Sequence, residues 1–244
     1  GEIEALCQRI DDIMLGNIVY PDMLMQLCPS AGDEEKARQS KDFKGSSLKY
    51  RKIQDLEKDP LFRAYIQHPL FRDLTAKIIG EEVAIFRAMF FNKPAEQGVT
   101  IDWHQDGAGG WRLTISPKIT VWTALDATCI ANGCLQIIPG SHKSSFDLAW
   151  RDYKGLDMPG ATSVTGKAGD VLLFSEAMIH NGLPKTTTGT RSNLYFNYVH
   201  AHYNVMMREP RNAHHFYFPA DIRARFSDQQ RALTRWMELT RWDH

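Results

Sequence analysis

The sequence predicts a single, mainly β domain with flanking helices, and three observations support this prediction. Short β-branched or aromatic runs such as VAIFRAMFF and NLYFNYV fill the middle of the chain, separated by turn residues. Helical spacing of apolar residues is confined to the two ends. No linker or repeat divides the 244 residues, a length that all-β domains reach undivided. We therefore expect one domain over residues 1–244.

The N-terminal region, residues 1–80, is predicted to be helical. Ile3, Leu6 and Ile10 recur at helical spacing. A second helical pattern begins at Leu61 and is interrupted at Pro69, because proline breaks a helix interior. Residues 30–49 are polar and rich in charge, Ser and Gly, so they predict a mobile loop between these helices.

The central region, residues 81–205, is predicted to form the β core. Turn pairs such as Asn132-Gly133 and Pro139-Gly140 punctuate its short strands, which favours an antiparallel sandwich or barrel over a parallel α/β sheet. Residues 141–163 lack a clear periodicity and are interpreted as an insertion. Residues 206–244 are predicted to be helical, since Ser227 and Gln230 form a capping box ahead of an apolar pattern.

Composition excludes several classes of protein. The 29 basic and 29 acidic side chains give zero net charge, which argues against a nucleic-acid binder. No apolar run approaches the length that crosses a bilayer, so no membrane association is expected. The four cysteines form no C-x-x-C pair, and a chain of this size needs no disulfides. A reduced, cytoplasmic protein is therefore predicted.

His104 and Asp106 are the first candidates for metal ligands. They lie in the segment DWHQDG, which follows a loop and should be extended. Side chains two residues apart in an extended chain share a face, so an imidazole and a carboxylate would point the same way. A third donor would complete a 2-His-1-carboxylate site with open metal positions. Taken alone, a short H-x-D pattern also fits a surface histidine and aspartate at a turn.

His180 and Arg191 are the next candidates. His180 closes the apolar run VLLFSEAMIH, where it is either a ligand or a hydrogen-bonded core residue. Arg191 opens the strand RSNLYFNYV, and a buried guanidinium there needs a counter-ion. Its planar fork suits a carboxylate, which a bound dicarboxylate or a distant Asp or Glu would supply.

Several motifs occur in an order that resembles a known protein family. The segments are WHQDG (103–107), VWTALDA (121–127), NGCLQIIPGSHK (132–143), AGDVLLFSEAMIHNGLP (168–184) and TGTRSN (188–193). Together they resemble the phytanoyl-CoA dioxygenase family of iron(II)/2-oxoglutarate-dependent oxygenases. That family has a double-stranded β-helix, or cupin-like jelly-roll, fold. The resemblance covers residues 83–200 and implies the same fold here.

The resemblance also implies roles for individual residues. His104, Asp106 and His180 take the places of the iron ligands, and Arg191 matches the arginine that grips the distal carboxylate of 2-oxoglutarate. Trp122 lies on the strand that lines the cosubstrate pocket, with Thr123 beside it.

Two further sets of residues are less closely tied to the family pattern. Asn193 stands where relatives often carry a serine and can still form a hydrogen bond. Gln105, Trp111 and Arg112 follow the H-x-D motif closely in sequence, and they either line the substrate entrance or pack within the loop.

The expected reaction is an oxidation of a small, secondary-metabolite-like molecule in biosynthesis. Fe(II), 2-oxoglutarate and O2 are the implied cofactor and cosubstrates, and hydroxylation of an unactivated C–H bond with release of succinate and CO2 is the implied outcome. Desaturation, epimerisation and ring formation stay open as alternatives. Halogenation is disfavoured because Asp106 is present. A non-catalytic jelly-roll binding module and a zinc hydrolase are the rival classes, and no oligomeric state is predicted.

Overall fold

The computed structural model of the chain describes residues 1–28, 38–81, 83–93, 100–106, 118–143 and 158–200. Its helical elements are α1 (Glu2–Leu15), η1 (Leu56–Lys58), α2 (Pro60–Ile66), α3 (Pro69–Ile78) and η2 (Ser141–Lys143). Its strands are β1 (Leu24–Leu27), β2 (Tyr50–Gln54), β3 (Val83–Lys93), β4 (Ile101–His104), β5 (Lys118–Ala124), β6 (Leu135–Ile137), β7 (Thr162–Val164), β8 (Val171–Ser175), β9 (His180–Gly182) and β10 (Arg191–His200).

The strands form two antiparallel sheets, which confirms the mainly β prediction. The larger sheet has six strands in the order β1-β2-β3-β10-β5-β8, and the smaller has four in the order β4-β9-β6-β7. β3 and β10 form the longest pairing and lie at the centre of the larger sheet. From β3 onward the chain crosses repeatedly between the sheets, with β3, β5, β8 and β10 in the larger sheet and β4, β6, β7 and β9 in the smaller. This crossing brings site residues of both sheets together.

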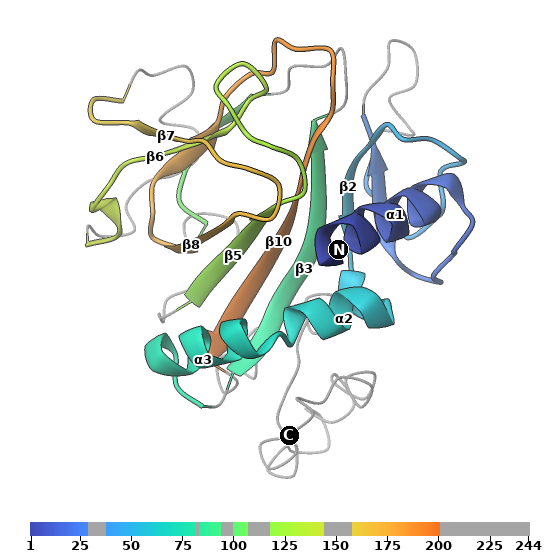
Figure 1. Cartoon of the computed structure of the whole chain (residues 1–244), viewed down its shortest axis with the longest axis horizontal. Helices are drawn as coiled ribbons and strands as arrows, with labels where there is room; N and C mark the ends of the chain where they lie inside the picture. The colour runs from blue at the N-terminus through green and yellow to red at the C-terminus, as the bar shows by residue number, and fades with distance from the viewer. Residues whose placement is uncertain (29–37, 82, 94–99, 107–117, 144–157, 201–244) are drawn as a thin grey trace.

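The N-terminal helices cover one face of the larger sheet (Figure 1). The core beneath them joins apolar residues of the helices with one set of alternating sheet residues, including Leu6, Ile10, Phe62, Ile66, Val121, Leu194 and Phe196. As predicted, Pro69 separates two helices, and it occupies the first turn of α3, where a missing N–H costs nothing. Asp59 caps α2 by accepting hydrogen bonds from the amides of Leu61 and Phe62.

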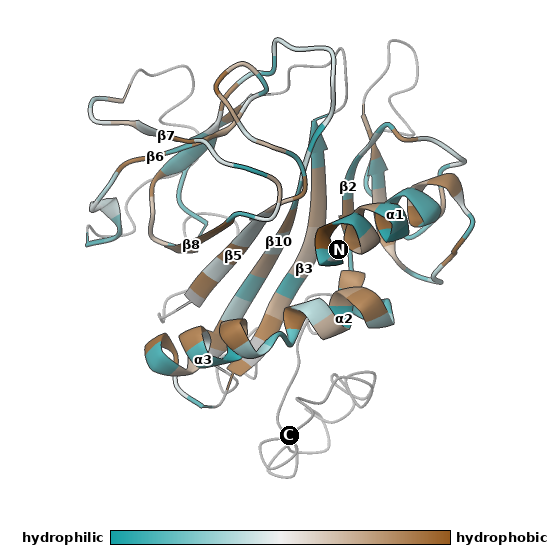
Figure 2. Ribbon diagram, viewed as in Figure 1, coloured by the Kyte–Doolittle hydropathy of each residue, from teal (hydrophilic) through white to brown (hydrophobic). Residues whose placement is uncertain are grey.

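The other face of the larger sheet looks toward the smaller sheet. A second apolar cluster lies there, made of Met89, Trp122, Ala124, Leu135, Phe174 and Tyr195. Hydrophobic residues with interspersed hydrophilic ones run along β3, β5 and β10 (Figure 2). Successive side chains of a strand point to opposite faces, so Leu194 and Phe196 lie under the helices, while Tyr195 points between the sheets. One face of β10 therefore packs against the helices, and the other face is available to form a site between the sheets.

The N-terminal third is less helical than predicted. The strands β1 and β2 lie within it, pair with each other and extend the larger sheet beside β3. The region 141–163 is described only at its two ends, where η2 and the start of β7 lie. The predicted C-terminal helix at 206–244 lies outside the described residues. Among the helices that are described, none is both long and apolar enough to cross a membrane.

Candidate metal centre

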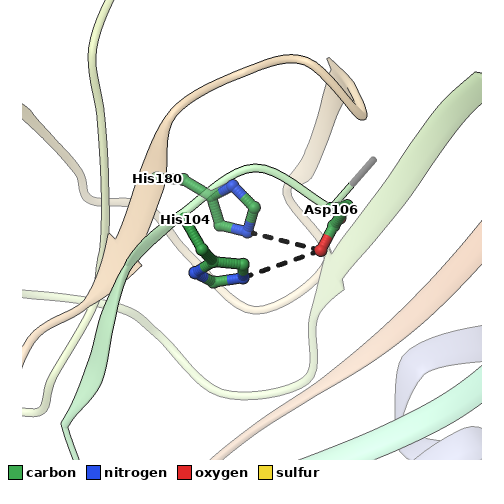
Figure 3. Close-up of side chains that lie close together, drawn as sticks. All are labelled: His104, Asp106 and His180. Carbon is green, nitrogen blue, oxygen red and sulfur yellow. Dashed lines mark ion pairs between the residues drawn. The ribbon is translucent and has the colours of Figure 1, made fainter. Parts of the chain in front are cut away.

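His104, Asp106 and His180 lie together between the two sheets. His104 ends β4 and His180 begins β9, and the two residues are direct partners across the antiparallel pair. Asp106 follows β4 by two residues and turns back toward both rings (Figure 3). One carboxylate oxygen, Oδ1, lies 3.6 Å from Nε2 of His104 and 4.0 Å from Nε2 of His180. All three side chains are buried.

These three side chains suit one metal ion. One donor atom from each lies within 4.8 Å of the others, and the two rings are 4.2 Å apart between centroids. Within the described part of the chain, no other group of three or more His, Cys, Asp or Glu side chains meets this criterion. Two imidazoles and one carboxylate on one side of a metal form the donor set of non-haem iron(II) sites, with the opposite positions left for substrates. The donor chemistry therefore fits iron(II).

Hydrogen bonds to backbone carbonyls fix the tautomer and the orientation of the two imidazoles. Nδ1 of His104 lies 2.8 Å from the carbonyl oxygen of Asp102, and Nδ1 of His180 lies 3.0 Å from that of Met178. A carbonyl oxygen can only accept, so each Nδ1 must be the protonated nitrogen. Each Nε2 then carries a lone pair and faces Asp106, which is the arrangement a metal ion needs.

Tyr195 orients the carboxylate. Its hydroxyl donates a hydrogen bond to Oδ2 of Asp106, while Oδ1 faces the two histidines. Burial, and next the Asp106 carboxylate, raise the pKa of Tyr195 well above its ordinary value. The phenol therefore stays protonated and remains a donor at neutral pH. Tyr195 was not predicted from the sequence, although it lies on the same strand face as Arg191, four residues further along.

A cavity of about 350 Å³ opens beside the three candidate ligands. Its volume lies within the range of small-molecule sites. Apolar and aromatic side chains from both sheets form part of its wall, among them Met89, Phe91, Trp122, Leu135 and Tyr195. Arg191 and Asn193 reach it from β10, so with Trp122 three of the predicted cosubstrate residues share this cavity with His104, Asp106 and His180.

Arg191 is buried, with 3% of its surface exposed, and it lines this cavity. Its Nη1 donates to Oδ1 of Asn193 and its Nη2 donates to the carbonyl of Gly133, each at 2.7 Å. Its Nε has no hydrogen-bond partner among the residues that the structure describes. Burial lowers the pKa of Arg191 to about 10, so the group is still a cation at neutral pH. A buried cation with an unused donor fits a ligand carboxylate, which 2-oxoglutarate would supply.

Two other predicted residues lie away from the cavity. Thr123 follows Trp122 on β5 and therefore faces the helices, where its hydroxyl lies 3.0 Å from that of Tyr65. Gln105 is fully buried between the two ligand positions and donates through Nε2 to the carbonyl of Ala177. Neither residue is among those that line the cavity, and the cosubstrate role of Thr123 and the substrate role of Gln105 stay predictions. Trp111 and Arg112 lie outside the described residues.

The comparisons with known proteins agree on the family. The sequence model of phytanoyl-CoA dioxygenase matches residues 1–193. A probable phytanoyl-CoA dioxygenase of Caenorhabditis elegans is 24% identical over 217 residues, which cover 81% of this chain and 68% of that protein. The phytanoyl-CoA dioxygenase of Arabidopsis thaliana is 25% identical over 174 residues, which cover 66% of this chain and 59% of that protein.

Solved structures share the fold. EctD from S. alaskensis with bound Fe superimposes with a TM-score of 0.62 at 20% identity, covering 82% of this chain and 69% of that one. The same protein has been solved with 2-oxoglutarate and 5-hydroxyectoine. The non-haem α-ketoglutarate-dependent epimerase SnoN gives a TM-score of 0.56 at 18% identity, over 82% of this chain and 74% of that one. These matches confirm the predicted jelly-roll fold. The chain thus belongs to the phytanoyl-CoA dioxygenase family, a family of iron(II)/2-oxoglutarate-dependent oxygenases.

Proposed function

We propose that this chain is a dioxygenase that uses iron(II) and 2-oxoglutarate to hydroxylate an unactivated C–H bond of a small molecule. In the overall reaction, 2-oxoglutarate and O2 are consumed, and succinate, CO2 and the hydroxylated product are released. The observation that carries the proposal is the convergence of His104, Asp106 and His180 on a cavity that also contains the buried guanidinium of Arg191. Metal ligands and a carboxylate-binding group in one cavity match the two groups that this reaction requires.

The three ligand side chains are assigned to the metal. His104 and His180 would bind iron through Nε2, since each Nδ1 donates to a backbone carbonyl. Asp106 would bind through Oδ1, while Tyr195 holds the second oxygen and prevents the carboxylate from rotating. When bound, iron(II) supplies the activation of O2, which amino-acid side chains cannot perform.

Arg191 is assigned to the distal carboxylate of 2-oxoglutarate. Asn193 and Gly133 each occupy one Nη group and thereby fix the plane of the guanidinium. The Nε edge is left for the ligand. Trp122 lies beside this group, with its ring centre 6.0 Å from the guanidinium carbon, and forms the adjoining wall. This arrangement sets the direction in which the keto-acid end of the cosubstrate can reach the metal.

The rival zinc hydrolase explains less of the cavity. The three ligands alone would suit zinc equally well. A hydrolase gives no role to Arg191, however, whose burial without an ion pair to any described carboxylate is costly unless an anion binds. The non-catalytic binding module is less well supported for a similar reason, because the ligand set and the arginine are all present.

Oxygen-free binding of Fe(II) and 2-oxoglutarate tests the proposal. Chelation of iron(II) by a keto acid gives a visible charge-transfer band, and we expect this band only when both are added. His104→Ala should abolish the band and succinate release. Arg191→Ala should weaken 2-oxoglutarate binding by roughly tenfold to a hundredfold, the range expected for lost hydrogen bonds to a charged group.

The product distinguishes the possible outcomes of the same site. Gain of one oxygen atom by a substrate identifies hydroxylation, whereas loss of two hydrogens or an unchanged mass identifies desaturation or epimerisation. Absence of the band at millimolar 2-oxoglutarate, or full turnover with zinc in place of iron, would contradict the dioxygenase.

A further inference from the structure

A second buried cation lies beside Arg191. Lys93 is the last residue of β3, Arg191 is the first of β10, and the two are direct partners in the antiparallel register. Lys93 is 6% exposed and Arg191 is 3% exposed. Both side chains line the same cavity as His104, Asp106 and His180. Two adjacent cations therefore enter the cavity from neighbouring strands.

The ammonium group of Lys93 lies against two glycines, Gly133 and Gly182. A Cβ atom added to Gly182 would lie 3.3 Å from Nζ of Lys93, and one added to Gly133 would lie 3.1 Å from it. Nζ also donates to the carbonyl of Leu183. The carbonyl of Gly133 accepts from Nη2 of Arg191, so Gly133 lies against both cations. Because Gly133 and Gly182 carry no side chains, the ammonium group of Lys93 has room there, in the cavity that Arg191 also lines.

The electrostatics of this pair favour an anion between them. Burial, and next the guanidinium of Arg191, lower the pKa of Lys93 to about 7. In the described ranges, no carboxylate lies within ion-pair distance of either group. Two buried cations without an acid are costly, and an anionic group that contacts both would offset this cost.

We propose that Lys93 is a second cation for the distal carboxylate of 2-oxoglutarate, acting together with Arg191. This inference rests on the proposed function. In it, the Nε edge of Arg191 and the ammonium of Lys93 hold the same carboxylate from two sides. The pair makes the site selective for keto acids that carry a second carboxylate, because a ligand without one leaves both cations uncompensated.

The alternative is a purely structural lysine that only ties β3 to the carbonyl of Leu183. That role predicts lower stability in a Lys93 variant and no change in which keto acid binds. Lys185 offers a matched control, since it is also buried and also donates to a backbone carbonyl, that of Thr187, but it does not line the cavity.

The experiment measures dissociation constants with the Fe(II)-loaded, oxygen-free protein. The ligands are 2-oxoglutarate and 2-oxopentanoate, which has the same chain length and keto-acid end but no distal carboxylate. We expect Lys93→Met to weaken 2-oxoglutarate binding roughly tenfold or more, since a charge-assisted contact is lost, and to change 2-oxopentanoate binding by less than about twofold. Lys93→Arg should keep most of the preference for 2-oxoglutarate, and Lys185→Met all of it.

Proton uptake gives a measurement that needs no variant. The charged and titratable groups that act on Lys93 are Arg191 on β10, Cys134 ahead of β6 and Arg51 on β2. At pH 8 most of the free lysine is neutral, and a bound carboxylate raises its pKa, so binding should take up a proton. Calorimetry of 2-oxoglutarate binding in two buffers of different ionisation enthalpy measures this uptake, which Lys93→Met should remove.

The outcomes separate this inference from the proposed function. If the unaltered protein does not bind 2-oxoglutarate, the proposed function fails and the inference fails with it. If the unaltered protein binds 2-oxoglutarate, and Lys93→Met binds it equally well or loses affinity for both keto acids alike, the function stands and the role of Lys93 is overturned. An Arg variant that binds 2-oxoglutarate no better than the Met variant also contradicts it.

Discussion

The hydroxyl of Tyr195 donates to one oxygen of Asp106, and the other oxygen of that carboxylate faces both histidines. The two residues are 89 positions apart in the chain: Tyr195 lies on β10 of the larger sheet, and Asp106 follows β4 of the smaller one by two residues. The carboxylate orientation is therefore set by the larger sheet, whereas both histidines belong to the smaller one. The ligand set forms only when the two sheets are correctly packed.

Tyr195→Phe removes this donor and tests its importance. We expect iron(II) affinity to fall roughly tenfold to a hundredfold, the effect typical of losing a hydrogen bond to a metal ligand. Metal titration under anaerobic conditions measures this change. Tyr198→Phe is the control, because its hydroxyl donates to the carbonyl of Ile66 in the helix-covered core. The control should lose about 1 kcal/mol of stability and retain iron affinity. If both variants bind iron(II) with equal affinity, Tyr195 does not orient the Asp106 carboxylate for metal binding.

Asn193→Ala should weaken 2-oxoglutarate binding without affecting iron binding. The amide oxygen of Asn193 accepts from Nη1 of Arg191, and its loss frees the guanidinium to rotate. We expect a loss of roughly tenfold in affinity, as for one hydrogen bond to a charged group. Asn193→Ser keeps an oxygen acceptor and should recover part of this loss. A serine variant as weak as the alanine variant would show that the amide acts by packing alone.

Asp59→Ala should destabilise the whole domain. Its carboxylate is fully buried, caps α2, and accepts from Arg9 and from the hydroxyl of Tyr20 at 2.7 Å each. Losing the cap costs about 1 kcal/mol and losing the charged contacts about 1.5–3 kcal/mol, so we expect roughly 2–4 kcal/mol by urea unfolding. Lys41→Ala should change stability by less than about 0.5 kcal/mol, since its 4.0 Å pair with Asp22 is exposed. Similar effects for the two variants would contradict the role of Asp59.

Glu57→Gln should alter how stability depends on pH. Burial, and next the carboxylate of Asp55, raise the pKa of Glu57 well above its ordinary value. Above about pH 4.5 the unfolded chain loses this proton while the folded chain keeps it, so stability falls as pH rises. The glutamine variant removes this contribution. Unfolding curves at pH 4 and pH 8 should show that the variant gains stability relative to the unaltered protein at pH 8 only. The same stability difference at both pH values would contradict the raised pKa of Glu57.

The sequence predicted the sheet core better than its edges. The apolar runs at β3, β5, β8 and β10 are recognisable because side chains on both faces of these strands pack against one of the two apolar clusters. β1 and β2 are only four and five residues long, and they join the sheet because β2 pairs with β3, residues 83–93, which lies distant in the chain, and β1 pairs with β2. Their identity as strands depends on that non-local pairing, which local periodicity does not reveal.

Some of the site residues could likewise be predicted from the sequence, and others could not. The ordered motifs were enough to predict His104, Asp106, His180 and Arg191, which the structure brings to one cavity. Thr123 follows Trp122 on β5 but faces the opposite side of the sheet, because neighbours on a strand alternate between its faces. Tyr195 and Lys93 were missed for a different reason. Tyr195 contacts Asp106 and Lys93 contacts Leu183, each about 90 residues away in the chain. A local sequence pattern does not predict such long-range contacts.

The hydrogen bonds that set the histidine tautomers come from main-chain oxygens two residues before each ring, at positions 102 and 178. Every amino acid supplies such an oxygen. Side-chain replacement at these two positions therefore leaves the proton on Nδ1 undisturbed, provided that the local strand path is retained. The tautomer of both imidazoles is thus independent of the side chains at these two positions.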